Sequence, residues 1–119
     1  MKILKIVFIT LILMMSINAQ QKQLVNKTSS VEAVGFKSFT ATWYCLTGKT
    51  ASGIKTKHGI VAADPRIFKL GTTIDILGMG SYLVADTGGA IKGNKIDIWT
   101  PSCNNAKKLG RKKVFVKKK

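Results

Sequence analysis

The sequence predicts a small, mainly β domain with about six short strands and one short helix. Apolar and polar residues alternate in several short stretches, and alternation with period two is typical of strands with one buried face. Turn-forming residues separate these stretches at the spacing expected of a small barrel or sandwich. Only one stretch, near the C-terminus, has the start and stop signals of a helix. A chain of 119 residues has room for one such domain.

The N-terminus has the pattern of a signal peptide. Lys2 and Lys5 give a positive start, residues 6–15 form an apolar run broken only by Thr10, and Ala19 offers a small residue for cleavage. A membrane anchor is the weaker alternative, because a spanning helix needs about 20 mostly apolar residues and this run is shorter. We therefore predict that residues 1–19 are removed on export and that no stable membrane span remains.

The mature chain divides into a linker and a folded domain. Residues 20–36 are mostly polar, which predicts a flexible linker. The domain of residues 37–119 begins with an aromatic and threonine-rich strand at residues 39–44. A Gly, Ser, Thr and Lys loop follows at residues 47–57. The next apolar run, 60–63, ends at Asp64-Pro65, where the proline pushes its predecessor out of helical geometry.

The rest of the domain supplies the remaining strands and the helix. Ser102 is a candidate N-cap, residues 103–109 the helix and Gly110 its stop. The further strands that the pattern predicts are residues 72–76, 81–85, 95–99 and 112–116.

The chain is strongly basic, with 20 Lys and Arg against 5 Asp and Glu and a formal charge of +15. Such a cation favours polyanionic partners. Export argues against nucleic acid and leaves cell-wall polymers, acidic glycans and anionic lipid surfaces. The simpler alternative is a surface that serves solubility alone.

Cys45 and Cys103 are the two cysteines of the chain. An even count in an exported protein indicates one disulfide and a secreted or periplasmic location. Closing so long a loop stabilises a domain by roughly 4 kcal/mol in the chain-entropy model.

The carboxylates indicate where chemistry could occur. Each of the four aspartates follows or lies between apolar residues, and burial of a carboxylate is costly unless the group is paired or used. Asp86 and Asp97 bracket a glycine-rich stretch and are a plausible acid-base pair. The alternative is a structural turn, in which Asp86 accepts backbone N–H bonds and the glycines supply positive φ angles.

Several short motifs follow one another between Lys37 and Lys117. They are Ala-Thr-Trp-Tyr-Cys-Leu-Thr-Gly at 41–48, Ala-Ser-Gly at 51–53, Ala-Ala-Asp-Pro at 62–65, Leu-Gly-Thr at 70–72 and Ala-Asp-Thr-Gly-Gly-Ala-Ile-Lys-Gly-Asn-Lys-Ile-Asp-Ile at 85–98. In this order and spacing they resemble the 3D (Asp-Asp-Asp) domain, which is related to the catalytic barrel of the membrane-bound lytic transglycosylase A family. The resemblance implies a six-stranded double-psi β-barrel with one short helix, and peptidoglycan as the substrate.

The resemblance also implies roles for three aspartates. Asp97 corresponds to the acid-base residue, Asp86 to its catalytic neighbour, and Asp64 to a wall or loop-fixing residue of the site. Asp75 has no place in the pattern and is expected on the surface. The other residues expected to bind substrate, together with Asp64, are Thr42, Tyr44, Thr87, Gly88, Gly89 and Lys92.

The expected reaction is cleavage of the β-1,4 link between N-acetylmuramic acid and N-acetylglucosamine. A neutral carboxyl protonates the leaving oxygen and then accepts the proton of the muramoyl C6 hydroxyl, which closes a 1,6-anhydro ring. For Asp97 to stay neutral, burial and the charge of Asp86 must outweigh Lys92 and Lys95. We therefore expect Lys92 to point toward substrate or solvent.

Other functions are weaker alternatives. A non-catalytic module that binds cell-wall glycan is the main one, because the fold alone does not decide activity. A cationic interaction protein that needs only its charge is another. His58 and Cys45 lack a third residue for a hydrolase site, and no zinc or calcium spacing is present, so we predict no metal and no cofactor.

Overall fold

The computed structural model describes residues 2–119 and separates the chain into two units, one ending at Val34 and the other Gly35–Lys119. The first unit is helix α1, Lys2–Ala33. The backbone is therefore helical over most of the range for which a flexible linker was predicted. Residues 20–34 contain no glycine or proline to interrupt a helix, and the chain leaves α1 through Gly35 at φ +89°.

The first part of α1 has the length and composition of a membrane span. This stretch, Lys2–Gln23, has 22 residues and a mean hydropathy of 1.9. A signal sequence near an N-terminus meets the same criteria, so removal of residues 1–19 stays a prediction.

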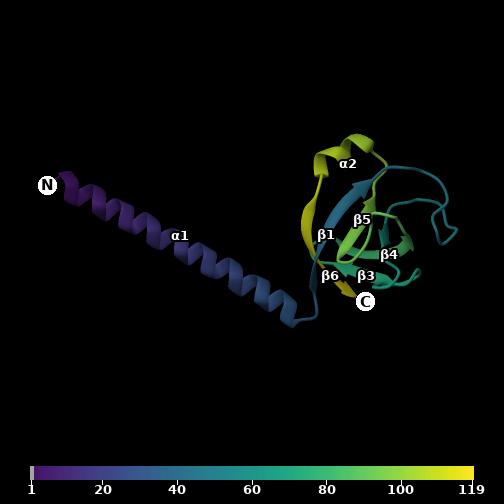
Figure 1. Cartoon of the computed structure of the whole chain (residues 1–119), viewed down its shortest axis with the longest axis horizontal. Helices are drawn as coiled ribbons and strands as arrows, with labels where there is room; N and C mark the ends of the chain where they lie inside the picture. Colours follow the sequence, from purple (N-terminus) through teal and green to yellow (C-terminus); the bar gives the residue numbers. More distant parts are fainter. Residues whose placement is uncertain (1) are drawn as a thin grey trace. The chain divides into compact units, whose positions relative to one another are not determined.

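The second unit is a closed barrel, which confirms the predicted mainly β, six-stranded class. Its strands run around the barrel in the order β1-β5-β2-β4-β3-β6. Figure 1 shows the barrel and labels all of these strands except β2. The elements are β1 Lys37–Tyr44, β2 Ile60–Ala63, β3 Thr73–Ile76, β4 Gly80–Asp86, β5 Lys95–Trp99, α2 Cys103–Leu109 and β6 Lys112–Lys118. Because the barrel is closed, every strand has two partners and no edge is exposed.

Strands distant in sequence are neighbours in the barrel. β1 pairs with β5, and β2 with β4, in parallel, whereas the other four pairs are antiparallel. These crossovers bring the end of β1 beside β5, and β2 between β5 and β4. The residues of the motif-rich segments 41–48, 62–65 and 85–98 therefore meet on one side of the barrel.

The hydrophobic core fills the barrel interior, with Trp43, Tyr82 and Val114 packed against it. Its buried members are Phe39, Ala41, Val61, Ala63, Phe68, Ile74, Ile76, Val84, Ile96, Ile98 and Val116. This core and the closed hydrogen bonding make the barrel a self-contained folding unit.

Helix α2 begins and ends where the sequence predicted. The Ser102 side chain accepts a hydrogen bond from the N–H of Asn105, and Gly110 ends the helix at φ +61°. The predicted disulfide is also present, since Cys45 at the end of β1 is bonded to Cys103 at the start of α2.

Candidate functional site

Four residues form a row across four neighbouring strands of the barrel. Asp97 on β5 is in register with Thr42 on β1 and with Ala62 on β2, and Ala62 is in register with Asp86 on β4. Residues directly opposite one another share a face of the sheet. The row lies on the outer face, because the residues flanking Ala62, Val61 and Ala63, belong to the core.

A β-bulge brings Asp86 into this row. The register of β2 and β4 pairs Val61 with Val84 and then shifts, so that Ala62 pairs with Asp86 and Ala85 is the extra residue. Without the shift Asp86 would lie opposite Ala63 and point toward the core. The bulge therefore turns the Asp86 carboxylate to the face that carries Asp97.

A cleft of about 400 Å³ lies over the row. Ala62 is only 4% exposed and forms part of the lining between the two aspartates. The lining residues are Tyr44, Leu46, Thr47, Gly48, Lys49, Thr56, Ala62, Asp86, Thr87, Gly88, Ile91 and Asp97. The cleft thus has a strand floor carrying two carboxylates and walls made by loops.

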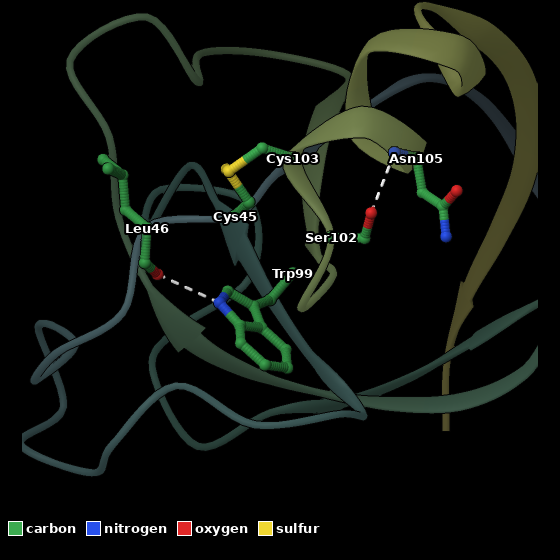
Figure 2. Close-up of a disulfide and its surroundings, with 6 residues drawn as sticks. All are labelled: Cys45, Leu46, Trp99, Ser102, Cys103 and Asn105. Carbon is green, nitrogen blue, oxygen red and sulfur yellow. Dashed lines mark hydrogen bonds between the residues drawn. A yellow bond between two sulfur atoms is a disulfide. The ribbon is translucent and has the colours of Figure 1, made fainter.

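One wall is the loop that follows β1. The indole N–H of Trp99 donates to the carbonyl of Leu46 at 2.9 Å, and the adjacent Cys45–Cys103 disulfide ties the start of the loop to α2 (Figure 2). Farther along, Ile54 packs against a second apolar cluster of Ile60, Ala85 and Trp99. These contacts hold the loop over the outer face of the barrel.

Asp97 is the less constrained carboxylate of the row. Its side chain is half-buried, and of the residues that the structure describes only Thr42 donates a hydrogen bond to it, from Oγ1 to Oδ1 at 2.9 Å. Burial raises the pKa of Asp97, and the charge of Asp86 adds to the rise; the Thr42 hydrogen bond and the charge of Lys95 act in the opposite direction. Within residues 2–119 Asp97 forms no ion pair.

Asp86 is held by three donors. Its Oδ1 accepts hydrogen bonds from the N–H groups of Ala51 and Thr87 at 3.0 and 2.9 Å, and its Oδ2 accepts one from the Tyr44 hydroxyl at 3.3 Å. Burial, followed by the charge and hydrogen bond of Asp86, raises the pKa of Tyr44, so this phenol stays a donor. Asp86 therefore links β4, β1 and the loop wall.

Asp64 lies outside the cleft lining and is 1% exposed. Its carboxylate pairs with Arg66 at 2.7 Å and accepts hydrogen bonds from the N–H groups of Arg66 and Gly93, both at 3.0 Å. The Arg66 side-chain hydrogen bonds, followed by those two backbone N–H groups, lower the pKa of Asp64. This geometry agrees with the loop-fixing role among those expected of Asp64, because its oxygens hold the 86–97 loop through Gly93, and a contact of Asp64 with substrate stays a prediction.

The other residues expected to bind substrate divide into two groups. Tyr44, Thr87 and Gly88 line the cleft. Thr42 is not part of the lining but donates a hydrogen bond to Asp97, which is. Gly89 and Lys92 are exposed and are not part of the lining. Lys92 therefore points to solvent, one of the two directions expected of it.

The glycines of the Asp86–Asp97 loop differ from the turn expectation. Gly88 and Gly89 have no positive φ, and Gly93 at φ +69° is the residue that needs one. Gly88 is required for space, because an added Cβ would lie 2.9 Å from Cγ1 of Ile91.

Several cleft residues were not predicted. Ala62 is an apolar strand residue without reactive groups, and its place between two aspartates depends on the strand order. Leu46, Gly48, Lys49 and Thr56 belong to the loop wall, which the contacts of Trp99 and Asp86 position. The sequence signals near them were the predicted loop 47–57 and the motifs 41–48 and 51–53.

The alternatives that used other residues lose their basis in this geometry. Cys45 is in a disulfide, so it is no nucleophile for His58, whose ring instead packs edge-on to Trp99 at 5.5 Å. In the described chain, residues 2–119, no three His, Cys, Asp or Glu side chains are placed to hold a metal ion.

Comparison with known proteins gives a consistent result. The family model of the 3D domain matches residues 59–118. Three Bacillus subtilis (strain 168) proteins are similar: "Cell wall-binding protein YocH" at 39% identity over 86% of this chain, "Putative cell wall shaping protein YabE" at 37% over 76%, and "SPbeta prophage-derived uncharacterized protein YorM" at 33% over 77%. The matches cover 39%, 23% and 45% of those proteins, so the chain spans less than half the length of each. With its closed six-stranded barrel and the aspartates of the motif in place, the chain belongs to the 3D domain family.

Proposed function

We propose that this chain is an exported cell-wall protein that binds the glycan strands of peptidoglycan in the cleft over Asp86 and Asp97. Two relatives are named for cell-wall binding and cell-wall shaping, which supports a role at the wall. The disulfide and the apolar N-terminal stretch support secretion or a periplasmic location. The formal charge of +15 favours anionic wall polymers as additional partners.

We further propose that the cleft cleaves the glycan as a lytic transglycosylase, with Asp97 as the single acid-base residue. The observation that carries this proposal is the half-buried Asp97 carboxyl with a raised pKa, one hydrogen-bond donor and direct access to the cleft. A carboxyl of this kind can hold a proton until a glycosidic oxygen comes within reach.

The reaction proceeds in two proton transfers. Asp97 donates its proton to the oxygen that links C1 of N-acetylmuramic acid to N-acetylglucosamine, and the C1–O bond breaks. The resulting carboxylate accepts the proton of the muramoyl C6 hydroxyl, whose oxygen bonds to C1 and closes the anhydro ring. The nucleophile comes from the substrate, so the reaction needs no cofactor and no second enzyme carboxylate.

The neighbouring residues hold Asp97 and the sugar in place. Thr42 holds one oxygen of Asp97 by a hydrogen bond. Asp86 holds the loop wall through the N–H of Ala51, and the charge of Asp86 favours the protonated form of Asp97. Tyr44, Thr87 and Gly88 offer hydroxyl and backbone groups to the sugar hydroxyls.

A binding module without catalysis is the second candidate. One relative is named as a cell wall-binding protein, which favours this candidate. In this case Asp97 accepts hydrogen bonds from sugar hydroxyls instead of transferring a proton, and the row Asp97–Ala62–Asp86 is a recognition surface.

One experiment separates the two candidates. Purified peptidoglycan is incubated with the wild type and with Asp97→Asn; bound protein is measured by co-sedimentation, and products by mass spectrometry. Anhydro-muropeptides from the wild type alone, with binding retained by Asp97→Asn, support catalysis. Equal binding by both proteins without any products supports the module.

A second variant tests the cleft itself. Ala62→Leu places a larger side chain between the two aspartates, on the outer face and away from the core. It is expected to weaken sedimentation with peptidoglycan while the near-UV circular dichroism stays that of the wild type. Full binding by a folded Ala62→Leu protein would show that peptidoglycan does not bind in the cleft, which would contradict both candidate functions.

A further inference from the structure

The last strand carries a concentration of positive charge on the side of the barrel away from the cleft. We call Lys37 together with Lys112, Lys113, Lys117 and Lys118 of β6 the basic face. In the order β1-β5-β2-β4-β3-β6, β6 lies three places from β2 in either direction. Because β2 supplies the cleft floor at Ala62, the basic face and the cleft lie on opposite sides of the barrel.

Three of these lysines lie over aromatic rings. The Nζ atoms of Lys112, Lys113 and Lys117 are 6.0, 5.6 and 4.8 Å from the ring centroids of Trp43, Phe115 and Phe36, respectively. Such contacts place each ammonium group over the face of a ring and hold the apolar stem of the lysine along the surface. The side chains therefore lose less conformational freedom when they bind an anion.

A second hollow adjoins the basic face. It has a volume of about 420 Å³, and the residues of its lining with polar side chains are Lys37, Lys117, Lys118 and Asn94. Phe39 and Phe68, whose rings are stacked at 5.6 Å, lie among its apolar lining. The hollow shares no lining residue with the cleft, so the two sites can be occupied independently.

The charge of the basic face is hardly compensated by the aspartates of the barrel. Asp86 and Asp97 belong to the cleft, and Asp64 is paired with Arg66. Asp75 on β3 is in register with Lys117, but it accepts a hydrogen bond from the Ser81 hydroxyl, to which Lys119 also donates. A group of lysines beside one engaged carboxylate attracts polyanions.

We propose that the basic face binds a linear, phosphate-bearing polymer of the cell surface while the cleft faces the glycan. Lys113 and Lys117 lie on the outer face of β6, opposite to that of Val114 and Val116, and their four-residue separation spaces them by roughly 13 Å along the strand, which suits an extended chain of phosphodiesters. The aromatic rings of Phe36, Phe115 and Trp43 lie under ammonium groups instead of being free to enter lipid, which favours a polymer over a membrane. The proposed function is needed here only for the location at the wall.

The test measures binding of fluorescently labelled poly(glycerol phosphate) by anisotropy, using the full chain in nonionic detergent. The variant Lys113→Gln/Lys117→Gln/Lys118→Gln removes three charges from the basic face. The control Lys55→Gln/Lys57→Gln/Lys69→Gln removes three exposed charges elsewhere. We expect the basic-face variant to lose about tenfold or more in affinity at low salt, and the control to lose much less. Lysine-to-arginine changes at the same three positions should retain binding.

Several results would overturn the proposal. Equal losses in the two lysine-to-glutamine variants would mean that net charge alone attracts the polymer. Mixed micelles containing phosphatidylglycerol that displace the polymer and depend on the same three lysines more strongly would identify a lipid surface instead. Failure of the polymer to bind the wild type would end the proposal directly.

The outcome is independent of catalysis in the cleft. Asp97→Asn should bind the polymer like the wild type, and the basic-face variant should release the same products from peptidoglycan freed of phosphate polymers. Polymer binding without any glycan cleavage would contradict the proposed transglycosylase activity and would still support polymer binding by the basic face.

Discussion

Asp64 and Asp97 are the same side chain in two regions of one barrel, with opposite surroundings. At the corner after β2, Asp64 is 1% exposed and engaged by Arg66 and by two backbone N–H groups. In the cleft, Asp97 has one donor, Thr42, and is reached from the cleft. The pKa of the first is lowered by its hydrogen bonds, and the pKa of the second is raised by its burial.

The difference shows that aspartates of one motif need not share one role. At the corner after β2 the carboxylate is fully paired, and this pairing stabilises the fold. The cleft leaves a carboxyl poorly paired, which costs stability and is the condition for proton transfer. The two regions are connected, since Asp64 holds Gly93 in the loop that leads from Asp86 to Asp97.

The largest effect is expected from Asp97→Asn. If Asp97 is the proton donor, its replacement should lower the rate of anhydro-muropeptide formation by about 10²–10⁴-fold, the usual contribution of a general acid. Release of products is followed by mass spectrometry. Asp75→Asn, on the surface of β3, is the matched control and should leave the rate unchanged. A rate that survives Asp97→Asn would place the chemistry elsewhere.

The cleft wall is expected to depend on the disulfide. Its cysteines are 58 residues apart, so Cys45→Ser/Cys103→Ser should lower the free energy of unfolding by about 4 kcal/mol in the chain-entropy model. Urea unfolding measures this loss. Because Cys45 precedes Leu46 of the wall, glycan binding should weaken as well under conditions where the variant is still folded. Unchanged binding would show that Trp99 and Ile54 hold the wall unaided.

Asp64→Asn should destabilise the barrel in a pH-dependent way. The pKa of Asp64 in the folded state lies below its unfolded value of 3.8, so the stabilisation is present above that pH and is lost as the pH falls through the folded-state pKa. The melting temperature of the variant should be lower than that of the wild type at pH 7, and the gap should close in acid. Arg66→Gln should have the smaller effect, because the backbone N–H bonds to Asp64 remain.

Asp86→Asn should change the pH dependence of cleavage. Activity requires protonated Asp97 and should decline as the pH rises through its pKa, which lies above 3.8. Removing the charge of Asp86 lowers that pKa, so the decline should move to lower pH. The ratio kcat/KM measured against pH detects the shift. If the midpoint of the pH dependence is unchanged, the charge of Asp86 does not affect the pKa of Asp97.

The smallest effect is expected from Tyr44→Phe. It removes one hydrogen bond of 3.3 Å to Asp86, worth about 0.5 kcal/mol, while Asp86 keeps its two backbone donors. Thermal unfolding should change little, and glycan affinity modestly. A large loss of affinity with unchanged stability would show that the proposed contact of the Tyr44 hydroxyl with sugar matters more for binding than its hydrogen bond to Asp86.

The sequence by itself determined the elements and the candidate aspartates. Alternation located the strands, Ser102 and Gly110 delimited α2, and the cysteine count predicted the disulfide, because these signals depend on local conformation or on composition. The flexible linker at residues 20–36 stays a prediction from polar composition, although the backbone is helical as far as Ala33.

Only the tertiary structure decided how the candidate residues combine. The closed strand order places Ala62 between Asp97 and Asp86, and the bulge at Ala85 turns Asp86 out of the core. Pairing partners and register are long-range properties, and a shift of one residue reverses the face of every side chain that follows. For this reason the motif located Asp64, Asp86 and Asp97 equally well. Only the folded barrel showed that Asp64 lies at the corner after β2 and that the other two aspartates lie in the cleft.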